Sequence, residues 1–310
     1  MSDAQPLVTF ARAITPLRSR DRFSRYLARG GLYAMATFGA VVFMGPFFFA
    51  LSGSLKSAAE IHIFPPPLLP SQLEFGNYVR LFEMPGAYFA RWYLNSVIIT
   101  LASMIGTLVS ACAAAYGFSR FRWGLRDFFF IVLLSTLVLP EEVVIIPKFL
   151  LFHYVPEALF GHTWIDTWWP LILPSWFGGG AFSVFLLRQF FLQIPRDLDE
   201  AAIIDGANSW QILWNILLPL AKPALATVAI FSFLTHWNDF FHPLIYLSTV
   251  ENFPMSVGLR WFQQLANDPG EPREHLLMAA SMLMVLPCVA IFFTMQRYFV
   301  RGIVLSGIKG

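Results

Sequence analysis

The chain has 310 residues and a formal net charge of +2; 57% of the residues are hydrophobic and only 13% are charged. A soluble globular domain carries about 25% charged residues, so this composition, with a mean hydropathy of +0.60, predicts an integral membrane protein. The small net charge excludes a nucleic acid as an expected partner.

Six apolar stretches are long enough to cross a membrane as helices, which need roughly 20 residues each. They occupy residues 31–51, 93–118, 128–151, 168–191, 223–247 and 276–299. Pro140 interrupts the third stretch and the glycines 178–180 interrupt the fourth. Such breaks are tolerated where neighbouring helices form hydrogen bonds with the freed backbone groups. The sequence therefore predicts an all-α polytopic membrane protein with six transmembrane helices and one helix, in the loop 193–222, that projects from the membrane.

The positions of Lys and Arg predict the orientation, because basic residues collect on the cytoplasmic side. With both termini inside, 15 of the 21 basic residues lie on the cytoplasmic side. The expected domains are a cytoplasmic N-terminal extension (1–30), a transmembrane domain (31–300) and a cytoplasmic tail (301–310). The Pro-rich outer segment 52–92 is interpreted as a connector, and the outer loop 248–275 as a docking surface for a soluble partner.

The inside loop 193–222 is a charged island between two apolar stretches. Asp199 and Glu200 are acids of the kind that is stabilised at the N-terminus of a helix, so they predict the start of a short helix here. Gly206 suits the left-handed turn that ends it. Asn208 or Ser209 can cap a second helix, which Pro219 ends. The pattern predicts a stiff helix–turn–helix that protrudes into the cytoplasm.

This loop resembles the signature segment of the permease subunits of bacterial ABC importers, in which a coupling helix docks on an ATPase subunit. The resemblance assigns ATPase coupling to Glu200, Ala201, Ala202, Asp205, Gly206, Ile216, Leu218 and Pro219. It implies a heterodimer with a sister permease, two ATPase subunits and an extracytoplasmic sugar-binding protein, in a bacterial or archaeal plasma membrane. The chain itself would be no enzyme and bind no cofactor, because ATP and Mg would sit on the ATPase subunits.

Two further segments resemble the carbohydrate-uptake branch of these permeases, specifically the second permease subunit of maltose-type systems. They are 237–240, with the sequence Trp-Asn-Asp-Phe, and the C-terminal segment 296–310. A sugar or oligosaccharide is the cargo that this branch implies.

Polar groups inside spans are functional candidates by default. An aromatic ring beside an amide and a carboxylate suits a sugar, so Trp237, Asn238 and Asp239 are the candidate substrate-pathway residues. An alternative interpretation is an ion-gradient-driven secondary transporter that would use Glu141, Glu142 and Asp239 as coupling groups. Another keeps the importer but changes the cargo to glycerol-phosphate or another polar solute. No metal-ligand spacing and no nucleophile motif is present in the sequence, so an enzyme and a metal site are not expected.

Overall fold

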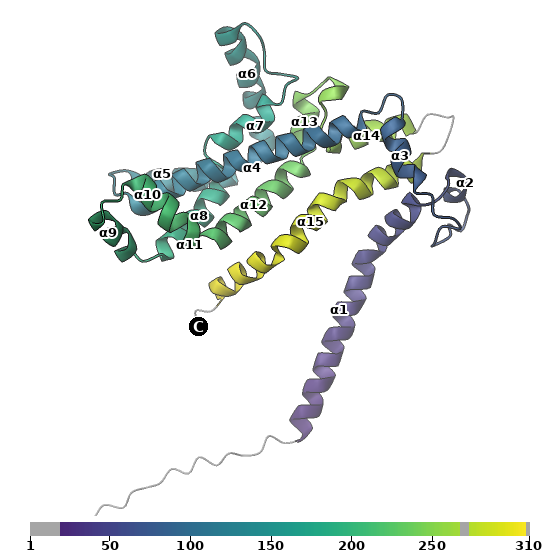
Figure 1. Ribbon diagram of the computed structural model, residues 1–310, viewed down its shortest axis with the longest axis horizontal. Helices are drawn as coiled ribbons and strands as arrows, with labels where there is room; N and C mark the ends of the chain where they lie inside the picture. The colour runs from purple at the N-terminus through teal and green to yellow at the C-terminus, as the bar shows by residue number, and fades with distance from the viewer. Residues whose placement is uncertain (1–18, 267–272, 308–310) are drawn as a thin grey trace, which may run out of the picture. The chain divides into compact units, whose positions relative to one another are not determined.

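The computed structural model describes residues 19–266 and 273–307, and within these ranges every regular element is a helix (Figure 1). The first 18 residues of the predicted extension and residues 308–310 of the predicted tail lie outside the described residues. Five helices are long and apolar enough to cross a membrane, and a bent pair makes a sixth. The described part of the chain therefore confirms an all-α polytopic fold.

Helix α1 (Ser19–Ser54) is mostly a unit of its own, which ends at Ala50. Its apolar stretch from Tyr26 to Ser54 contains an 18-residue segment with a mean hydropathy of 1.9, and the large apolar side chains along the stretch are exposed. A helix that is apolar on all sides needs lipid or other helices around it, so α1 has the properties of a transmembrane span.

The second unit is built around the long helix α4 (Phe89–Arg120), which packs against α7 (Trp169–Trp176), α8 (Ala181–Gln193) and α12 (Lys222–Trp237) (Figure 1). Small residues allow this close packing. A Cβ atom built on Gly106 would lie 2.5 Å from the ring of Trp176, so only glycine fits there without a shift. Ala111 and Ala115 are fully buried on the same helix.

The core has two clusters, one toward each end of α4. The cluster toward the Phe89 end includes Trp92, Tyr246 and Phe262. The cluster toward the Arg120 end includes Leu187 and Leu217. We refer to the two regions as the Phe89 end and the Arg120 end.

The third and fourth spans are broken where the sequence predicts, but the helix limits of the third differ from the expected ones. Helix α5 (Arg126–Ser135) and a 3-10 turn (η1, Thr136–Val138) precede Pro140, and α6 (Glu141–Phe160) follows it. The apolar helix long enough to span is α6, so the predicted limits 128–151 are wrong. Pro140 interrupts the stretch as predicted and occupies the position before the first residue of α6.

The fifth span is shorter than predicted. Helix α12 ends at Trp237, and a separate short helix, α13 (Phe241–Tyr246), occupies the rest of the predicted stretch 223–247. The sixth, α15 (Glu274–Gly307), contains Pro287 and continues as one helix across the predicted boundary at residue 300.

The expected outer connector 52–92 and the expected docking loop 248–275 both contain helices of their own. These are α2 (Ala58–Ile61), α3 (Gly76–Glu83), a 3-10 turn (η3, Val250–Asn252) and α14 (Met255–Ala266). Leu81 and Met255 are fully buried, which shows that α3 and α14 contribute to the core at the Phe89 end.

Candidate functional site

The loop 193–222 forms the predicted helix–turn–helix. Helix α9 (Asp197–Ile204) carries Asp197, Asp199 and Glu200 in its first turn, where the helix dipole favours acids. Gly206 takes a φ of +85°, the left-handed conformation that ends α9.

The second arm starts with a capping box. The Asn208 side chain accepts a hydrogen bond from the Gln211 N–H at 2.9 Å, and the Gln211 side chain accepts one from the Asn208 N–H at 2.8 Å. The arm continues as α10 (Ser209–Ile212), a π-helical turn (η2, Leu213–Leu217) and α11 (Leu218–Leu220). The arm ends one residue after Pro219, close to the predicted end.

A buried ion pair fixes α9 to the end of α4. Arg120 Nε lies 3.0 Å from Asp199 Oδ2, and the two side chains are only 6% and 14% exposed. Burial raises the pKa of the Asp199 carboxyl, and the attraction of Arg120 and Arg196 only partly opposes this effect. Removal of either partner would leave a buried charge without its counter-ion.

Three hydrogen bonds to backbone carbonyls reinforce this attachment. Arg120 Nη2 donates to the Ile194 carbonyl at 3.1 Å, and Arg196 Nη2 donates to the Ser119 carbonyl at 3.1 Å. The Tyr116 hydroxyl donates to the Ser209 carbonyl at 3.0 Å. Both arms of the loop are therefore tied to the last turn of α4, so a displacement of the loop is passed to that helix.

The free face of α9 is partly apolar. Ile203 and Ile204 are 59% and 86% exposed, and Glu200 and Ala201 beside them are exposed too. On the second arm, Trp210 and Trp214 are 66% and 62% exposed. Exposed apolar groups clustered among charged ones are typical of a protein docking surface.

The other face of the second arm is packed inside the chain. Ile212, Leu213 and Leu217 are buried against the cluster at the Arg120 end, as the helical spacing predicts. Among the sequence-predicted coupling residues, Ile216 and Leu218 are half-buried at the base of the arm. Glu200, Ala201, Asp205, Gly206 and Pro219 are exposed, and Ala202 is half-buried.

The three predicted pathway residues lie in different environments. Trp237 is only 2% exposed, its indole N–H donates to the Met284 carbonyl at 3.0 Å, and its ring stacks on Phe233. Asn238 is exposed and Asp239 is half-buried. The Trp237 indole is therefore a packed core group, whereas the Asn238 amide and the Asp239 carboxylate remain accessible to a solute.

Asp239 belongs to a charge network whose members were not predictable from their positions in the sequence. His242 Nδ1 lies 3.0 Å from Asp239 Oδ2, and His242 Nε2 lies 3.0 Å from Glu141 Oε1. Lys148 Nζ lies 3.8 Å from the same Glu141 oxygen. The network joins the start of α6 to the break between α12 and α13.

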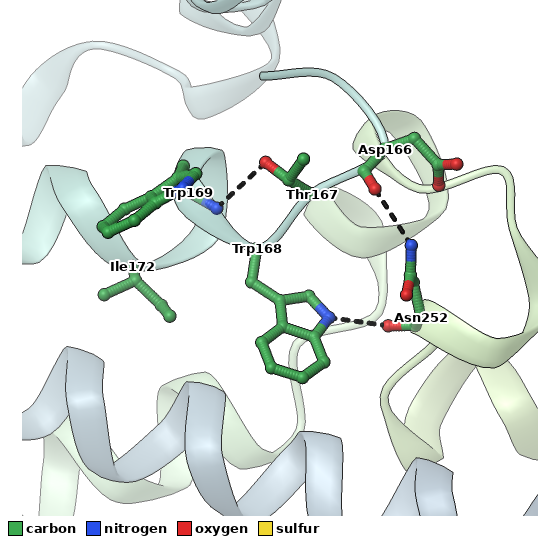
Figure 2. A pocket seen from close by; sticks show the side chains of 6 residues that line it. All are labelled: Asp166, Thr167, Trp168, Trp169, Ile172 and Asn252. Carbon is green, nitrogen blue, oxygen red and sulfur yellow. Dashed lines mark hydrogen bonds between the residues drawn. The ribbon is translucent and has the colours of Figure 1, made fainter. Parts of the chain in front are cut away.

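At the Phe89 end, Asp166 joins two loops beside a cavity of about 430 Å³, whose lining Figure 2 shows. Its Oδ1 accepts hydrogen bonds from the N–H groups of Ser248 and Thr249 at 2.8 and 2.9 Å. Its carbonyl accepts one from Asn252 Nδ2 at 3.0 Å, and the Trp168 indole donates to the Asn252 carbonyl at 3.0 Å (Figure 2). Burial alone would raise the pKa of Asp166, but the hydrogen bonds from Thr249 and Ser248 outweigh it and lower that pKa.

Asn95 and Trp92 hold the same end from within α4. Asn95 Nδ2 donates to the carbonyls of Glu251 and Phe253 at 2.8 and 2.9 Å, and the Trp92 indole donates to the Val250 carbonyl at 2.7 Å. An amide inside an apolar span is the signal that could have identified Asn95 from sequence.

No group of three His, Cys, Asp or Glu side chains among the described residues is arranged to hold a metal ion.

These features define a polytopic membrane protein with a polar helix–turn–helix, the loop 193–222, attached to the end of α4. Residues 106–305 match the family of binding-protein-dependent transport system inner membrane components, and the chain belongs to that family. It is therefore a multi-pass inner-membrane permease of the ABC importer class, which confirms the predicted family.

Curated relatives match most of the chain. It is 32% identical over 296 residues to the arabinooligosaccharides transport system permease protein AraQ of Bacillus subtilis (strain 168), covering 95% of this chain and 100% of AraQ. It is 30% identical over 279 residues to the sn-glycerol-3-phosphate transport system permease protein UgpE of Yersinia enterocolitica, covering 88% and 95%.

A solved structure shares the fold. A chain of a bacterial ABC transporter involved in the import of the acidic polysaccharide alginate superposes with a TM-score of 0.75 at 26% identity, covering 92% of this chain and 100% of that one. A bacterial alginate ABC transporter in complex with an alginate pentasaccharide-bound periplasmic protein gives a TM-score of 0.63 at 17% identity.

Proposed function

We propose that this permease forms half of the translocation pathway of an ATP-driven importer for a sugar or oligosaccharide. Its partners are a sister permease, two ATPase subunits and an extracytoplasmic sugar-binding protein. ATP and Mg act on the ATPase subunits, and this chain binds neither and catalyses no reaction. The sugar-transport names of AraQ and of the alginate importer support a carbohydrate cargo.

The observation that carries the coupling role is the attachment of α9. Its outer face offers Glu200, Ala201 and the isoleucines 203 and 204, while its inner face is fixed by the Arg120–Asp199 pair to a 32-residue helix. A docked ATPase subunit that moves α9 therefore moves α4 as well. The Arg120 end is cytoplasmic in this proposal, in line with the distribution of basic residues.

The polar groups near Asn238 suit a sugar better than glycerol-phosphate. Glu141 and Asp239 bring two carboxylates to this region, and His242 and Lys148 lie against them. Sugar hydroxyls can donate hydrogen bonds to the carboxylates, whereas both basic groups of this network are already engaged with a carboxylate and not reserved for a phosphate.

The docking role is tested by tagged purification of the chain from its native cell in mild detergent, with mass spectrometry of the co-purifying proteins. The wild type is expected to retain a second permease and an ATPase subunit. Glu200→Lys should lose the ATPase but keep the sister permease. Glu83→Lys is the matched control, because it reverses an exposed acid on α3 at the opposite end of the unit. Normal ATPase recovery with Glu200→Lys would contradict the assignment.

The cargo is tested by competition for uptake in cells that express the complete importer. A neutral oligosaccharide should compete with the transported solute, and sn-glycerol-3-phosphate should not. The reverse result would replace sugar with the phosphate ester and leave the coupling role intact.

A further inference from the structure

A second cavity, which is polar, lies at the Arg120 end and is not lined by the loop 193–222. Its volume is about 270 Å³, and residues 122–128 line it in the turn from α4 into α5. Neither the family signature nor the pathway residues include this turn, and nothing in the proposed coupling mechanism uses it.

The cavity carries an excess of positive charge. Arg122 is exposed and makes no hydrogen bond or ion pair with any described residue. Arg126 Nε donates to Asp127 Oδ1 at 2.9 Å, and this hydrogen bond, with a smaller contribution from Arg188, lowers the pKa of the Asp127 carboxyl. Asp127 thus stays ionised and neutralises one arginine.

Arg188 does not line the cavity, but it is close enough to Asp127 to contribute to the lowered pKa of that carboxyl. Its guanidinium lies 4.0 Å from the centre of the Phe130 ring, and its Nε donates to the Phe118 carbonyl at 3.3 Å. The two arginines and one aspartate of the lining leave a local charge of about +1, which suits a phosphate group because guanidinium groups bind phosphate oxygens in a bidentate manner.

The rim of the cavity is apolar and aromatic. Trp123, Leu125 and Phe128 are 43%, 60% and 59% exposed. Tryptophan is enriched where a membrane protein meets the headgroup region of the bilayer. A soluble phosphate would use only the arginines, whereas a phospholipid would also cover these apolar side chains with its glycerol and acyl chains.

We propose that this cavity binds the headgroup of an anionic phospholipid from the adjoining leaflet, with Arg122 and Arg126 on the phosphate and Trp123 against the acyl region. The inference rests on the proposed orientation, which makes that leaflet the cytoplasmic one. Basic cavities beside transmembrane helices on the cytoplasmic side are suited to acidic lipid headgroups.

The test is native mass spectrometry of the purified transporter titrated with phosphatidylglycerol or with phosphatidylethanolamine of the same acyl chains. The wild type should bind phosphatidylglycerol more tightly. Arg122→Gln should weaken that binding about fivefold, the effect of one arginine near a membrane surface, and leave phosphatidylethanolamine unchanged. Arg122 has no internal partner, so this substitution should not disturb folding.

Arg91→Gln is the matched control, because Arg91 is an exposed arginine near the start of α4, whereas Arg122 follows the end of that helix. Equal losses in Arg122→Gln and Arg91→Gln, or no preference for phosphatidylglycerol, would overturn the proposal. Tighter binding of inorganic phosphate than of phosphatidylglycerol would assign the cavity to a soluble anion. Unchanged lipid binding together with loss of the ATPase from Arg122→Gln would make the turn a protein contact instead.

The lipid titration and the ATPase recovery test different parts of the two proposals. Failure of Glu200→Lys to release the ATPase would overturn the coupling role and leave the lipid titration readable. If the transporter retains its ATPase and shows no preference for phosphatidylglycerol, only the proposed lipid site is overturned.

Discussion

The two ends of α4 are attached to the rest of the chain by different chemistry. At the Arg120 end, one buried ion pair and three hydrogen bonds from long or phenolic side chains hold the loop 193–222, whose outer face is exposed. At the Phe89 end, the neutral side chains of Trp92 and Asn95 bind the backbone of residues 250–253 inside a dense aromatic cluster. The difference teaches that charged side chains hold a surface element with a free outer face, whereas neutral side chains hold a segment that is part of the core.

Replacement of Asp199 by Ala should give the largest effect, because it leaves the Arg120 guanidinium buried without its counter-ion. Breaking a buried pair costs roughly 3 kcal/mol, which corresponds to an increase of about 100-fold in local opening. Hydrogen exchange of the amides of residues 197–206 measures it. Asp166→Ala is the control at the other end and should affect only residues near 166 and 248–252. Unchanged exchange in Asp199→Ala would show that the carbonyl hydrogen bonds alone hold the loop.

Replacement of Asn95 by Leu should come next. It removes two hydrogen bonds and leaves the carbonyls of Glu251 and Phe253 without a donor, at a cost of about 2 kcal/mol. The thermal midpoint of the purified transporter should fall, while ATPase recovery stays normal because the Arg120 end is untouched. Loss of the ATPase in this variant would contradict the independence of the two ends.

Two glycines with similar positive φ values allow the effect of an alanine to be compared between the two ends. Gly206 and Gly86 have φ values of +85° and +79°, and a Cβ atom would meet nothing within 4 Å at either position. Substitution by Ala should cost about 1 kcal/mol at each. Only Gly206→Ala should reduce sugar uptake, by roughly fivefold, because it alone alters the end of α9. Equal loss of uptake from both variants would point to general instability.

The smallest effect should come from pH at the Phe89 end. The lowered pKa of Asp166 means that its ionised form is stabilised by folding. This contribution is complete above about pH 4, the ordinary pKa of aspartate, and is lost as the pH falls through the lowered value. Pepsin cleavage between residues 161 and 168 should therefore accelerate below about pH 4 in the wild type. In Asp166→Asn the pH dependence should follow pepsin activity alone.

Local signals made the docking loop predictable in detail. Gly206, Asn208 and Pro219 each determine the backbone within a few residues, and all three act in the structure much as the sequence indicates. The two span breaks at Pro140 and at the glycines 178–180 were predictable for the same reason.

Contacts between distant segments were not predictable. In the sequence, Arg120 indicated only the orientation of the chain. In the structure, its contacts with Ile194 and Asp199 attach the loop 193–222 to α4. Asp166 and Ser248 are 82 residues apart, and no local pattern joins them. Helix α14 was not predicted because its apolar side packs on the chain rather than on lipid, and the aromatic and polar residues of the loop 248–275 indicated only a docking surface.

The bend between Ser209–Leu220 and Lys222–Trp237 measures 81° and has a mechanical consequence. The first segment is a lever arm about 18 Å long, at 1.5 Å per helical residue. Its joint is stiff because Ala221 and Leu217 are both fully buried. A displacement of about 3 Å at the Ser209 tip, perpendicular to the arm, would turn the arm by roughly 10° at that length. A force directed along the arm would exert no torque on the joint. The direction of the push therefore determines whether α12 tilts or slides.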